Sequence, residues 1–428
     1  MNASPPAAYR LPSQLAIALA LLVFSAFINY IDRGNLSIAA PLIKDELRLT
    51  GSQLGILLSS FFWTYGFFQI LSGWLVDRFH VSWIMAAGFF LWSAATSLTG
   101  LLHGFTALLL VRTVLGIGES VAYPAYSRIL AQYFPDDHRG FANSAIASGQ
   151  ACGPAFGMLL GGTLMARFGW RPFFIILGLL SLLWLVPWLK WMPRGPGFAP
   201  ASVRPDLGTS ASAAQPGFLE ILRQRSAWGS FAGLFCLNYK LYFLVAWLPF
   251  YLVRERNLSM FAMARIGGAI FLTQAVASVL CGRASDRWIA AGASPTRVRK
   301  TFMAIGLTTG GLFLAASVLA PTAICVLLLM LTGASLGFST SNIWAITQTL
   351  AGAQASGRWT GLQCAFANLS GAVASAVTGF LLDRTGHFVA AFALTAAVAF
   401  LGALCWIFVV GPVEQVPWPE HPTPLVLG

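Results

Sequence analysis

Residues Arg112 to Pro124, with the sequence RTVLGIGESVAYP, place an arginine and a glutamate inside an otherwise apolar run. On a helix that turns about 100° per residue, the seven steps from Arg112 to Glu119 return to within about 20° of the same face. Both charges therefore point the same way. A charge at bilayer depth costs on the order of 2.5 to 3.5 kcal/mol, so it is kept only where it faces water or a partner. The pair is a candidate functional site, with a purely structural ion pair as the alternative.

The composition around this stretch indicates a membrane protein. Of 428 residues, 57% are hydrophobic and 9% are charged, with a mean hydropathy of +0.73. This mixture excludes a soluble domain of this length, and the apolar runs are too long for the strands of an outer-membrane barrel. We therefore predict an all-α integral membrane protein with twelve transmembrane helices, at residues 14–40, 52–76, 82–102, 104–132, 140–165, 172–192, 227–252, 260–283, 300–320, 322–350, 357–382 and 388–411.

The distribution of basic residues predicts the orientation. The Lys and Arg residues concentrate at Arg10 and in the loops after even-numbered spans, so the positive-inside rule places both termini and the central loop in the cytoplasm. The net charge of +12 is then explained by topology, and we expect no nucleic-acid partner. The first 14 residues, MNASPPAAYRLPSQ, lack the pattern of a cleaved signal peptide, so we expect the first span to be retained.

Internal repeats divide the chain into two halves. Gly73-x-x-x-Asp77-Arg78 after the second span recurs as Gly282-x-x-x-Asp286-Arg287 after the eighth, and GGTLMARFGWR at 161–171 is echoed by GFLLDRTGHF at 379–388. Many secondary transporters are built from such repeats, with the substrate site at the midplane between them. We predict a six-helix bundle at 1–192, a flexible cytoplasmic linker rich in Pro, Gly, Ser and Ala at 193–225, and a second six-helix bundle with a short cytoplasmic tail at 226–428.

The first span carries a second charged pair in FINYIDRGNLSIAAP. Because neighbouring helical residues differ by about 100° in direction, Asp32 and Arg33 cannot both face one partner. One of them is expected to face a central cavity while the other reaches another helix. In the alternative interpretation, Asp32 permanently neutralises Arg33 or Arg112.

Polar side chains on other apolar spans and one further cation complete the candidate site. The cation, Lys240, either snorkels to the nearer interface or faces the cavity as an anion ligand. For the side-chain amides of Asn342, Gln363 and Asn368, a hydrogen bond between helices is the alternative to a contact with the substrate. Tyr, Asn and Gln together would suit a polyhydroxylated substrate. The predicted substrate-binding set is Asn29, Arg33, Tyr65, Arg112, Gln150, Lys240, Asn342, Gln363 and Asn368.

The sequence lacks the motifs of metal sites, of ATP-driven transporters and of membrane enzymes. None of the six cysteines forms a close pair of the metal-site type, so we expect no disulfide, metal or cofactor. No G-x-x-x-x-G-K-[ST] run is present, which argues against ATP-driven transport by this chain alone. A polytopic membrane enzyme would need a nucleophile, an acid–base pair or a metal cluster near an interface, and the sequence contains none that we recognise. A receptor or channel of the same fold is the remaining alternative.

The chain resembles the major facilitator superfamily and, within it, the bacterial anion:cation symporters related to vertebrate organic-anion and vesicular glutamate carriers. The resemblance spans nearly the whole chain, and its first-span and fourth-span motifs are the most specific. The chain departs from the family pattern at two places. In the first repeat loop, His80 stands where the superfamily usually has Gly, and Ser82-Trp83 stands where a basic residue is common. In the eleventh span, Cys364 stands where several relatives have an asparagine. The matching motifs are Asn29-Tyr30-x-Asp32-Arg33 with Leu36-Ser37, Gly73-x-x-x-Asp77-Arg78, Arg112-x-x-x-Gly116-x-Gly118-Glu119 with Pro124, Gly149-Gln150 before Gly153-Pro154, Gly169-Trp170-Arg171, and Trp247-Leu248-Pro249-x-Tyr251-Leu252.

The resemblance implies roles for individual residues. The arginine matching Arg33 binds the substrate carboxylate, and the acids matching Asp32 and Glu119 take part in proton coupling. The repeat loops have a gating role, which falls on Asp77, Arg78, Asp286 and Arg287. The family also implies a monomer in the lipid bilayer of the bacterial inner membrane, with a small organic anion and protons as its partners.

These observations combine into one expected mechanism. Burial and a nearby arginine act in opposite directions on the proton affinity of a carboxyl group, so Asp32 and Glu119 could exchange protons as substrate comes and goes. Neutralising either acid frees an arginine for the substrate, so proton and anion favour each other. We expect proton-coupled uptake of an organic anion, with a sugar acid (aldonate or aldarate) first and an aromatic or short dicarboxylate second. The sequence leaves sodium coupling open.

Overall fold

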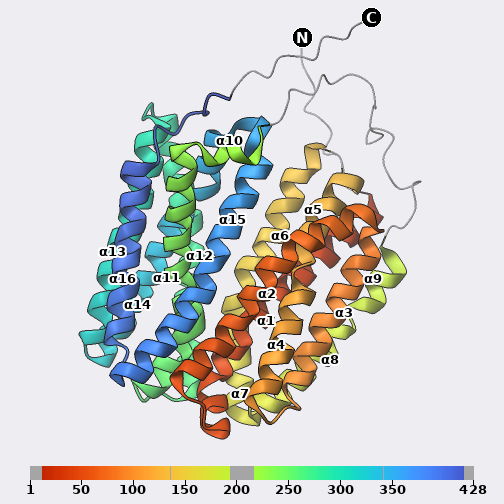
Figure 1. Cartoon of the computed structure of the whole chain (residues 1–428), viewed down its shortest axis with the longest axis vertical. Coiled ribbons are helices and arrows are strands. Elements are labelled where there is room, and N and C mark those ends of the chain that lie inside the picture. The colour runs from red at the N-terminus through yellow and green to blue at the C-terminus, as the bar shows by residue number, and fades with distance from the viewer. Residues whose placement is uncertain (1–11, 135, 193–215, 341, 419–428) are drawn as a thin grey trace, which may run out of the picture.

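The computed structural model describes residues 12–134, 136–192, 216–340 and 342–418, and within these ranges it contains helices and no strands. Two groups of helices lie side by side in Figure 1. The N-terminal half consists of α1 (Ser13–Leu47), α2 (Gly51–Arg78), α3 (Val81–Thr99), α4 (Phe105–Glu119), α5 (Ala122–Tyr133), α6 (Asp136–Phe156), the π-helix η1 (Gly157–Gly161), α7 (Gly162–Phe168), α8 (Trp170–Leu182) and α9 (Leu185–Trp191). The C-terminal half consists of α10 (Phe218–Leu222), α11 (Arg225–Arg254), α12 (Met260–Ala290), α13 (Pro295–Leu319), α14 (Thr322–Thr340), α15 (Ile343–Thr385), α16 (Val389–Leu404) and the π-helix η4 (Cys405–Val409).

Eleven helical segments in the described ranges are long and apolar enough to cross a membrane. The remaining expected span, 140–165, corresponds to α6, η1 and α7, which run without interruption from 136 to 168. Its sequence contains many Gly, Ala, Ser, Asn and Gln residues, which lowers its apolarity. A helix of this composition is suited to packing against other helices, because small residues allow close approach of backbones.

One expected boundary coincides with a kink, and the expected linker is partly helical. The predicted end of the tenth span near residue 350 falls at Gly352, where α15 is kinked, so that Thr322–Gly352 and Arg358–Thr385 are separate apolar segments. Gly352 has φ 63°, a left-handed conformation that glycine adopts without steric cost. Residues 193–215 of the expected linker lie outside the described ranges, and its last part forms α10 and the first residue of α11.

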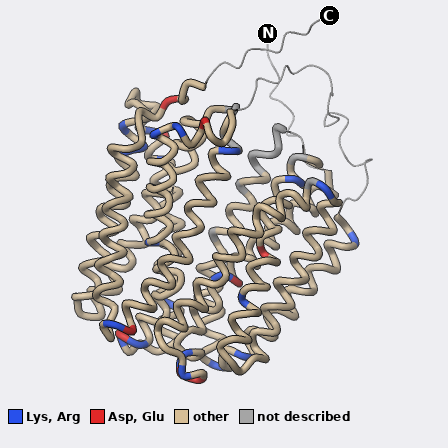
Figure 2. The backbone as a smooth tube through the Cα atoms, viewed as in Figure 1, with Lys and Arg blue, Asp and Glu red and all other residues tan. Residues whose placement is uncertain are grey.

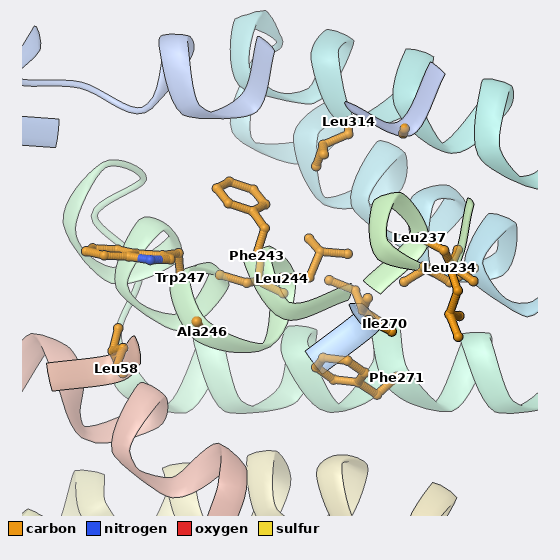
Figure 3. Close-up of a cluster of buried hydrophobic side chains, with 14 of the residues drawn as sticks. Leu58, Leu234, Leu237, Phe243, Leu244, Ala246, Trp247, Ile270, Phe271 and Leu314 are labelled. Carbon is orange, nitrogen blue, oxygen red and sulfur yellow. The ribbon is translucent and has the colours of Figure 1, made fainter. Parts of the chain in front are cut away.

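Apolar packing in the C-terminal half is centred on α11, and it extends across the boundary between the halves. Figure 3 shows Leu58 of α2 beside Ala246 and Trp247 of α11, and all three belong to one buried cluster. In lipid, such contacts stabilise by packing density and not by exclusion of water. The same cluster contains Leu234, Leu237, Phe243, Leu244, Ile270, Phe271 and Leu314.

Charged residues concentrate at the two ends of the helices, with a few in the middle of the molecule (Figure 2). This distribution is expected for a chain in a bilayer, since a charge at mid-depth needs a partner or water. The few central charges are therefore the ones that require a functional or structural explanation.

At one end of the molecule, α2 and α15 touch through glycines. A Cβ atom at Gly55 would collide with the backbone of Ser375 and Gly379, and one at Gly379 would collide with the backbone of Gly51. Only glycine permits this approach of two helices from different halves. We call this end, where residues 51–55 meet residues 379–383, the closed end.

A carboxylate from the C-terminal half completes the N-terminus of α2. Asp383 accepts hydrogen bonds from the backbone N–H groups of Gly51 (2.6 Å) and Ser52 (2.7 Å). The next N–H group, of Gln53, donates to the side chain of Thr50 at 3.1 Å. Three otherwise unpaired N–H groups of the first turn are thus satisfied, and the negative charge lies at the positive end of the helix dipole.

Arg254 provides a second link between the halves at the closed end. It forms an ion pair with Asp45 at the end of α1 and donates to the carbonyl oxygen of Pro41 at 3.3 Å. A cavity of about 380 Å³ lies beside these contacts, lined by Lys44, Phe250, Arg254, Glu255, Leu382, Asp383, Gly386 and Phe388. Because Arg254 and Asp383 already bind the opposite half, we assign this cavity to the closure and not to a ligand.

The tight packing of glycines between α2 and α15 does not continue along the whole of both helices. At Gly66 and Gly73 of α2 and at Gly361 of α15, no described atom lies within 4 Å of the position that a Cβ would occupy. The backbone contacts through glycine are therefore found at the closed end and not at these positions. Figure 1 shows the same convergence, with α15 and the first two helices nearest to each other at the bottom of the view.

Replacing Asp383 with Ala should weaken the closed end, because two N–H groups of α2 lose their acceptor. Loss of a helix cap costs about 0.5 to 2 kcal/mol, so the fraction of molecules separated at this end should rise roughly 2- to 30-fold. Spin labels at Arg48 and Arg384, in a background without native cysteines, would report the distance between the halves. Glu414→Ala, which removes an exposed acid elsewhere, is the control, and an unchanged distance distribution in Asp383→Ala would contradict this prediction.

Candidate functional site

The centre of the candidate site is an ion pair between α1 and α4. Arg33 donates from Nε to Oε2 of Glu119 at 3.1 Å, and the side-chain exposures are 11% for Arg33 and 0% for Glu119. Arg33 is therefore the more exposed member of the pair. Gly34, the next residue of α1, has no described atom within 4 Å of its Cβ position, so α1 is not tightly packed on that side of the helix.

Both members of the pair keep unused hydrogen-bonding capacity. Within the described part of the chain, Nη2 of Arg33 and Oε1 of Glu119 are buried and have no hydrogen-bond partner. Buried polar groups are normally satisfied, since each unsatisfied one costs about 1 to 3 kcal/mol or more when charged. An arginine that uses one edge of its guanidinium and leaves another donor unused is arranged to accept a further ligand.

Aromatic rings surround the Arg33 guanidinium. Its Cζ lies 4.8 Å from the ring centroid of Tyr30, 4.4 Å from that of Tyr65 and 5.4 Å from that of Phe61. Cation–π attraction holds the guanidinium between these faces. The Tyr30 hydroxyl also lies 2.7 Å from the Tyr123 hydroxyl on α5, so the rings are themselves positioned by hydrogen bonds.

Asp32 and Arg112 form a deeper layer behind this pair. Asp32 is 1% exposed and accepts a hydrogen bond from Nδ2 of Asn35 at 3.3 Å, while Arg112 is 5% exposed and donates from Nη2 to the Arg33 carbonyl at 3.4 Å. Asp32 and Arg33 thus have different partners, as their positions on a helix require. Arg112 and Glu119 are both buried on α4, in agreement with the shared face deduced from their spacing.

The C-terminal half presents uncharged polar groups to this site. The Tyr242 ring of α11 packs on Phe62 of α2 with centroids 4.6 Å apart, and Phe62 contacts Phe61, whose ring lies 5.4 Å from Cζ of Arg33. Its hydroxyl donates to Oδ1 of Asn368 on α15 at 3.4 Å. Asn368 is thereby brought toward the arginine, together with a tyrosine that the sequence analysis did not single out.

Three other predicted ligands lie elsewhere in the C-terminal half. Lys240 is fully buried and donates to the Gly306 carbonyl of α13 at 3.2 Å. Gln363 bridges Thr347 and the Ser230 carbonyl, at 2.8 and 3.2 Å. Asn342 accepts from Ser285 at 2.9 Å, near the end of α12. The structure does not bring these three side chains to Arg33, because their polar atoms are engaged between helices of their own half.

The remaining predicted residues lie beside the site or at helix ends. Asn29 is buried next to Glu119, and Gln150 is partly exposed on α6, which packs against α1. Arg78, Asp286 and Arg287 are exposed near the ends of α2 and α12. The side chain of Asp77 lies outside the described part of the structure.

Sequence reasoning missed most of the aromatic enclosure. Tyr30 stands three residues before Arg33 and Tyr123 four residues after Glu119, spacings that place side chains on one helical face. That signal was available in the sequence. By contrast, Phe61, Phe62 and Tyr242 come from α2 and α11, and the sequence contains no information on how these helices are arranged around α1.

Residues 22–363 and 266–427 match the family model described as Major Facilitator Superfamily. The chain belongs to the major facilitator superfamily. This membership, together with the eleven apolar segments, confirms the predicted fold class and the predicted family.

Relatives in this family are named as transporters. A probable sulfoacetate transporter of Cupriavidus necator is 30% identical over 94% of this chain and 95% of its own length. A hexuronate transporter of Bacillus subtilis is 28% identical over 92% and 94%. The crystal structure of a bacterial homologue of the lysosomal transporter Spinster, inward-facing and unoccupied, has the same fold, with a TM-score of 0.74, 19% identity and coverage of 94% and 96%. These relatives confirm the prediction of a transporter and not an enzyme.

A double-substitution experiment tests whether Arg33 and Glu119 act as a pair. Removing one partner of a buried ion pair leaves an uncompensated charge and costs about 3 to 5 kcal/mol, whereas removing both leaves none. Arg33→Met and Glu119→Met should each lower the melting temperature of the detergent-solubilised protein. The double variant should melt above either single variant, and additive losses would contradict the pairing.

Proposed function

We propose that this protein is a secondary transporter that takes up an organic anion together with a proton by alternating access, and that its cargo is a sugar acid of the aldonate or aldarate type. The observation that carries this proposal is the buried Nη2 donor of Arg33, which has no partner among the described residues although Glu119 already binds Nε. A guanidinium fork matches a carboxylate geometrically. The relatives named for sulfoacetate and hexuronate transport support an anionic cargo.

The surrounding residues suit a carboxylate that carries hydroxyl groups. Tyr65 and Asn29 lie next to the Arg33–Glu119 pair, Gln150 lies on the helix packed against α1, and Asn368 approaches from the other half. Hydroxyl and amide groups both donate and accept hydrogen bonds, as sugar hydroxyls require. We assign these four residues and Arg33 to substrate binding, with Arg112 behind them.

Coupling follows from competition for one guanidinium. While Glu119 is ionised, it occupies Arg33 and opposes entry of a second anion. Once Glu119 takes up a proton, the guanidinium is available to the substrate carboxylate, so proton and anion each favour binding of the other. Asp32 is the second buried acid of the site, and its Oδ2 has no described partner. We assign proton coupling to Asp32 and Glu119.

In alternating access, the two halves would separate at the closed end and come together at the opposite end. In the present state the halves are joined through Asp383 and Arg254. In the opposite state, we propose that the repeat loops of Asp77-Arg78 and Asp286-Arg287 provide the contacts. The proposal includes a monomer in the bacterial inner membrane, with the closed end facing outward and both termini in the cytoplasm, in keeping with the basic loops.

Uptake into liposomes containing the purified full-length protein tests the proposal. Labelled sugar acids should accumulate when the lumen is alkaline relative to the outside, and a protonophore should abolish the accumulation. A sodium gradient without a pH gradient should not drive uptake. Absence of uptake for every sugar acid, or accumulation that resists the protonophore, would overturn the corresponding part of the proposal.

Replacing Arg33 with Lys should impair binding while keeping the positive charge. The lysine ammonium cannot bind Glu119 and a substrate carboxylate through separate edges of one fork. Loss of a charged hydrogen bond costs about 1.5 to 3 kcal/mol, which corresponds to roughly 10- to 150-fold weaker binding. The readout is substrate protection against thermal unfolding. Arg265→Lys, at an exposed position, is the matched control, and equal binding in both variants would exclude Arg33 as the anchor.

Replacing Glu119 with Gln should separate exchange from accumulation. The amide cannot cycle a proton, so labelled substrate should still exchange with unlabelled substrate across the membrane, while uphill uptake driven by a pH gradient is lost. Counterflow and gradient-driven uptake would be measured in the same liposome preparation. Glu414→Gln serves as control. If the Glu119 variant still concentrates substrate, the acid has no role in coupling.

A further inference from the structure

We propose that the site prefers sugar acids with a single carboxylate, such as aldonates and uronates, over aldarates that carry a carboxylate at each end. This inference rests on the proposed function and narrows its substrate class. It is drawn from the distribution of charge at the boundary between the halves. The basic groups at the centre of this boundary belong to the N-terminal half, and the side chains that the C-terminal half contributes there are uncharged.

On the N-terminal side, both central arginines lie at the same end of the site. Arg33 is the more exposed of the two, with 11% side-chain exposure and a buried Nη2 donor that has no described partner. Arg112 is 5% exposed; its Nη2 donates to the Arg33 carbonyl, and its buried Nε has no described partner. Asp32 and Glu119 balance the charge of these two arginines. The N-terminal side therefore provides positive charge for one end of a substrate only.

On the C-terminal side, the groups that approach Arg33 are uncharged. Tyr242 packs on Phe62, which adjoins the Phe61 ring beside Arg33, and the Tyr242 hydroxyl donates to Asn368 at 3.4 Å. Cys364 lies one turn before Asn368 on α15. These side chains can bind a hydroxyl group at the far end of a substrate by hydrogen bonding, but they supply no positive charge.

Lys240, the cation in the middle of the C-terminal half, makes its contacts within that half. Lys240 is fully buried, donates to Gly306 at 3.2 Å and lies against Gly310 and Ser335 inside its own half. Other described basic residues of this half lie near the ends of their helices, in keeping with the distribution of charge in Figure 2, except Arg358, which follows the kink at Gly352 and donates to the Pro216 carbonyl. Lys240 therefore does not provide the second carboxylate anchor that a dicarboxylate would need.

The consequence for a six-carbon acid depends on its far end. When its first carboxylate binds Arg33, the chain extends across the boundary toward Tyr242 and Asn368. A terminal CH2OH group finds donors and acceptors there. A terminal carboxylate must give up water without gaining a cationic partner, and an ionised group in that position is far more costly than a hydroxyl.

The test compares acids that differ at one carbon atom. Gluconate and glucarate share the stereochemistry of all four internal hydroxyls, and so do galactonate and galactarate. In competition with a labelled sugar acid that the protein takes up, the monocarboxylate of each pair should inhibit at a concentration at least about tenfold lower, equivalent to about 1.4 kcal/mol.

A charge-adding variant tests the cause of the preference. Asn368→Lys places an ammonium group on the C-terminal side, so it should shift the inhibition ratio toward glucarate by about tenfold or more. Ala291→Lys adds the same charge at the exposed end of α12 and should leave the ratio unchanged. The wild-type comparison does not depend on either variant, so a misfolded Asn368→Lys protein would not remove the test.

The outcomes separate this inference from the proposed function. If uptake occurs and glucarate competes as well as gluconate or better, the single-carboxylate preference is overturned while sugar-acid transport stands. If the preference is present but Asn368→Lys folds and does not shift it, the assignment to C-terminal charge is overturned. If no sugar acid is taken up or competes, the proposed function itself fails.

Discussion

The interaction on which this structure depends is a guanidinium shared between a carboxylate and two aromatic faces inside the membrane. A charge at this depth is unstable without compensation, and Glu119 with Tyr30 and Tyr65 supplies that compensation for Arg33. The compensation is incomplete, because one donor and one acceptor of the pair remain unused. A fully satisfied ion pair would serve structure alone, whereas an incompletely satisfied one can exchange its partner for a ligand.

The same helices that hold this pair also form the closed end. Arg33 lies in α1, whose last turns carry Pro41 and Asp45 to Arg254. Tyr65 lies in α2, whose first turn is completed by Asp383. A change in the direction of α1 or α2 would therefore affect the ion pair and the closure together. This mechanical link is the physical basis on which binding at the centre could alter contacts between the halves.

The closed end is stabilised by a second electrostatic interaction, between the Asp383 carboxylate and the N-terminus of α2. Because Asp383 belongs to the opposite half, part of the stability of α2 depends on closure. Glycines at 51, 55 and 379 make the approach possible, because any side chain there would meet backbone. Such a contact can be broken and remade without unfolding either half, since water can satisfy the released N–H groups.

Sequence alone determined the helical membrane fold and the central charges. The long apolar runs determine the fold, because a segment of that length can cross lipid only as a helix, in which every backbone N–H and C=O group is hydrogen-bonded. The cost of burying charge identifies Asp32, Arg33, Arg112 and Glu119, and helical spacing sets their faces. Tertiary structure decided which charges meet. Arg33 bonds to Glu119, 86 residues away, and Lys240 turns into its own half, because helix packing between distant segments is not encoded in local periodicity. For the same reason, the contacts of Tyr242 with Phe62 beside the Arg33 site and of Asp383 with α2 could be learned only from the folded chain.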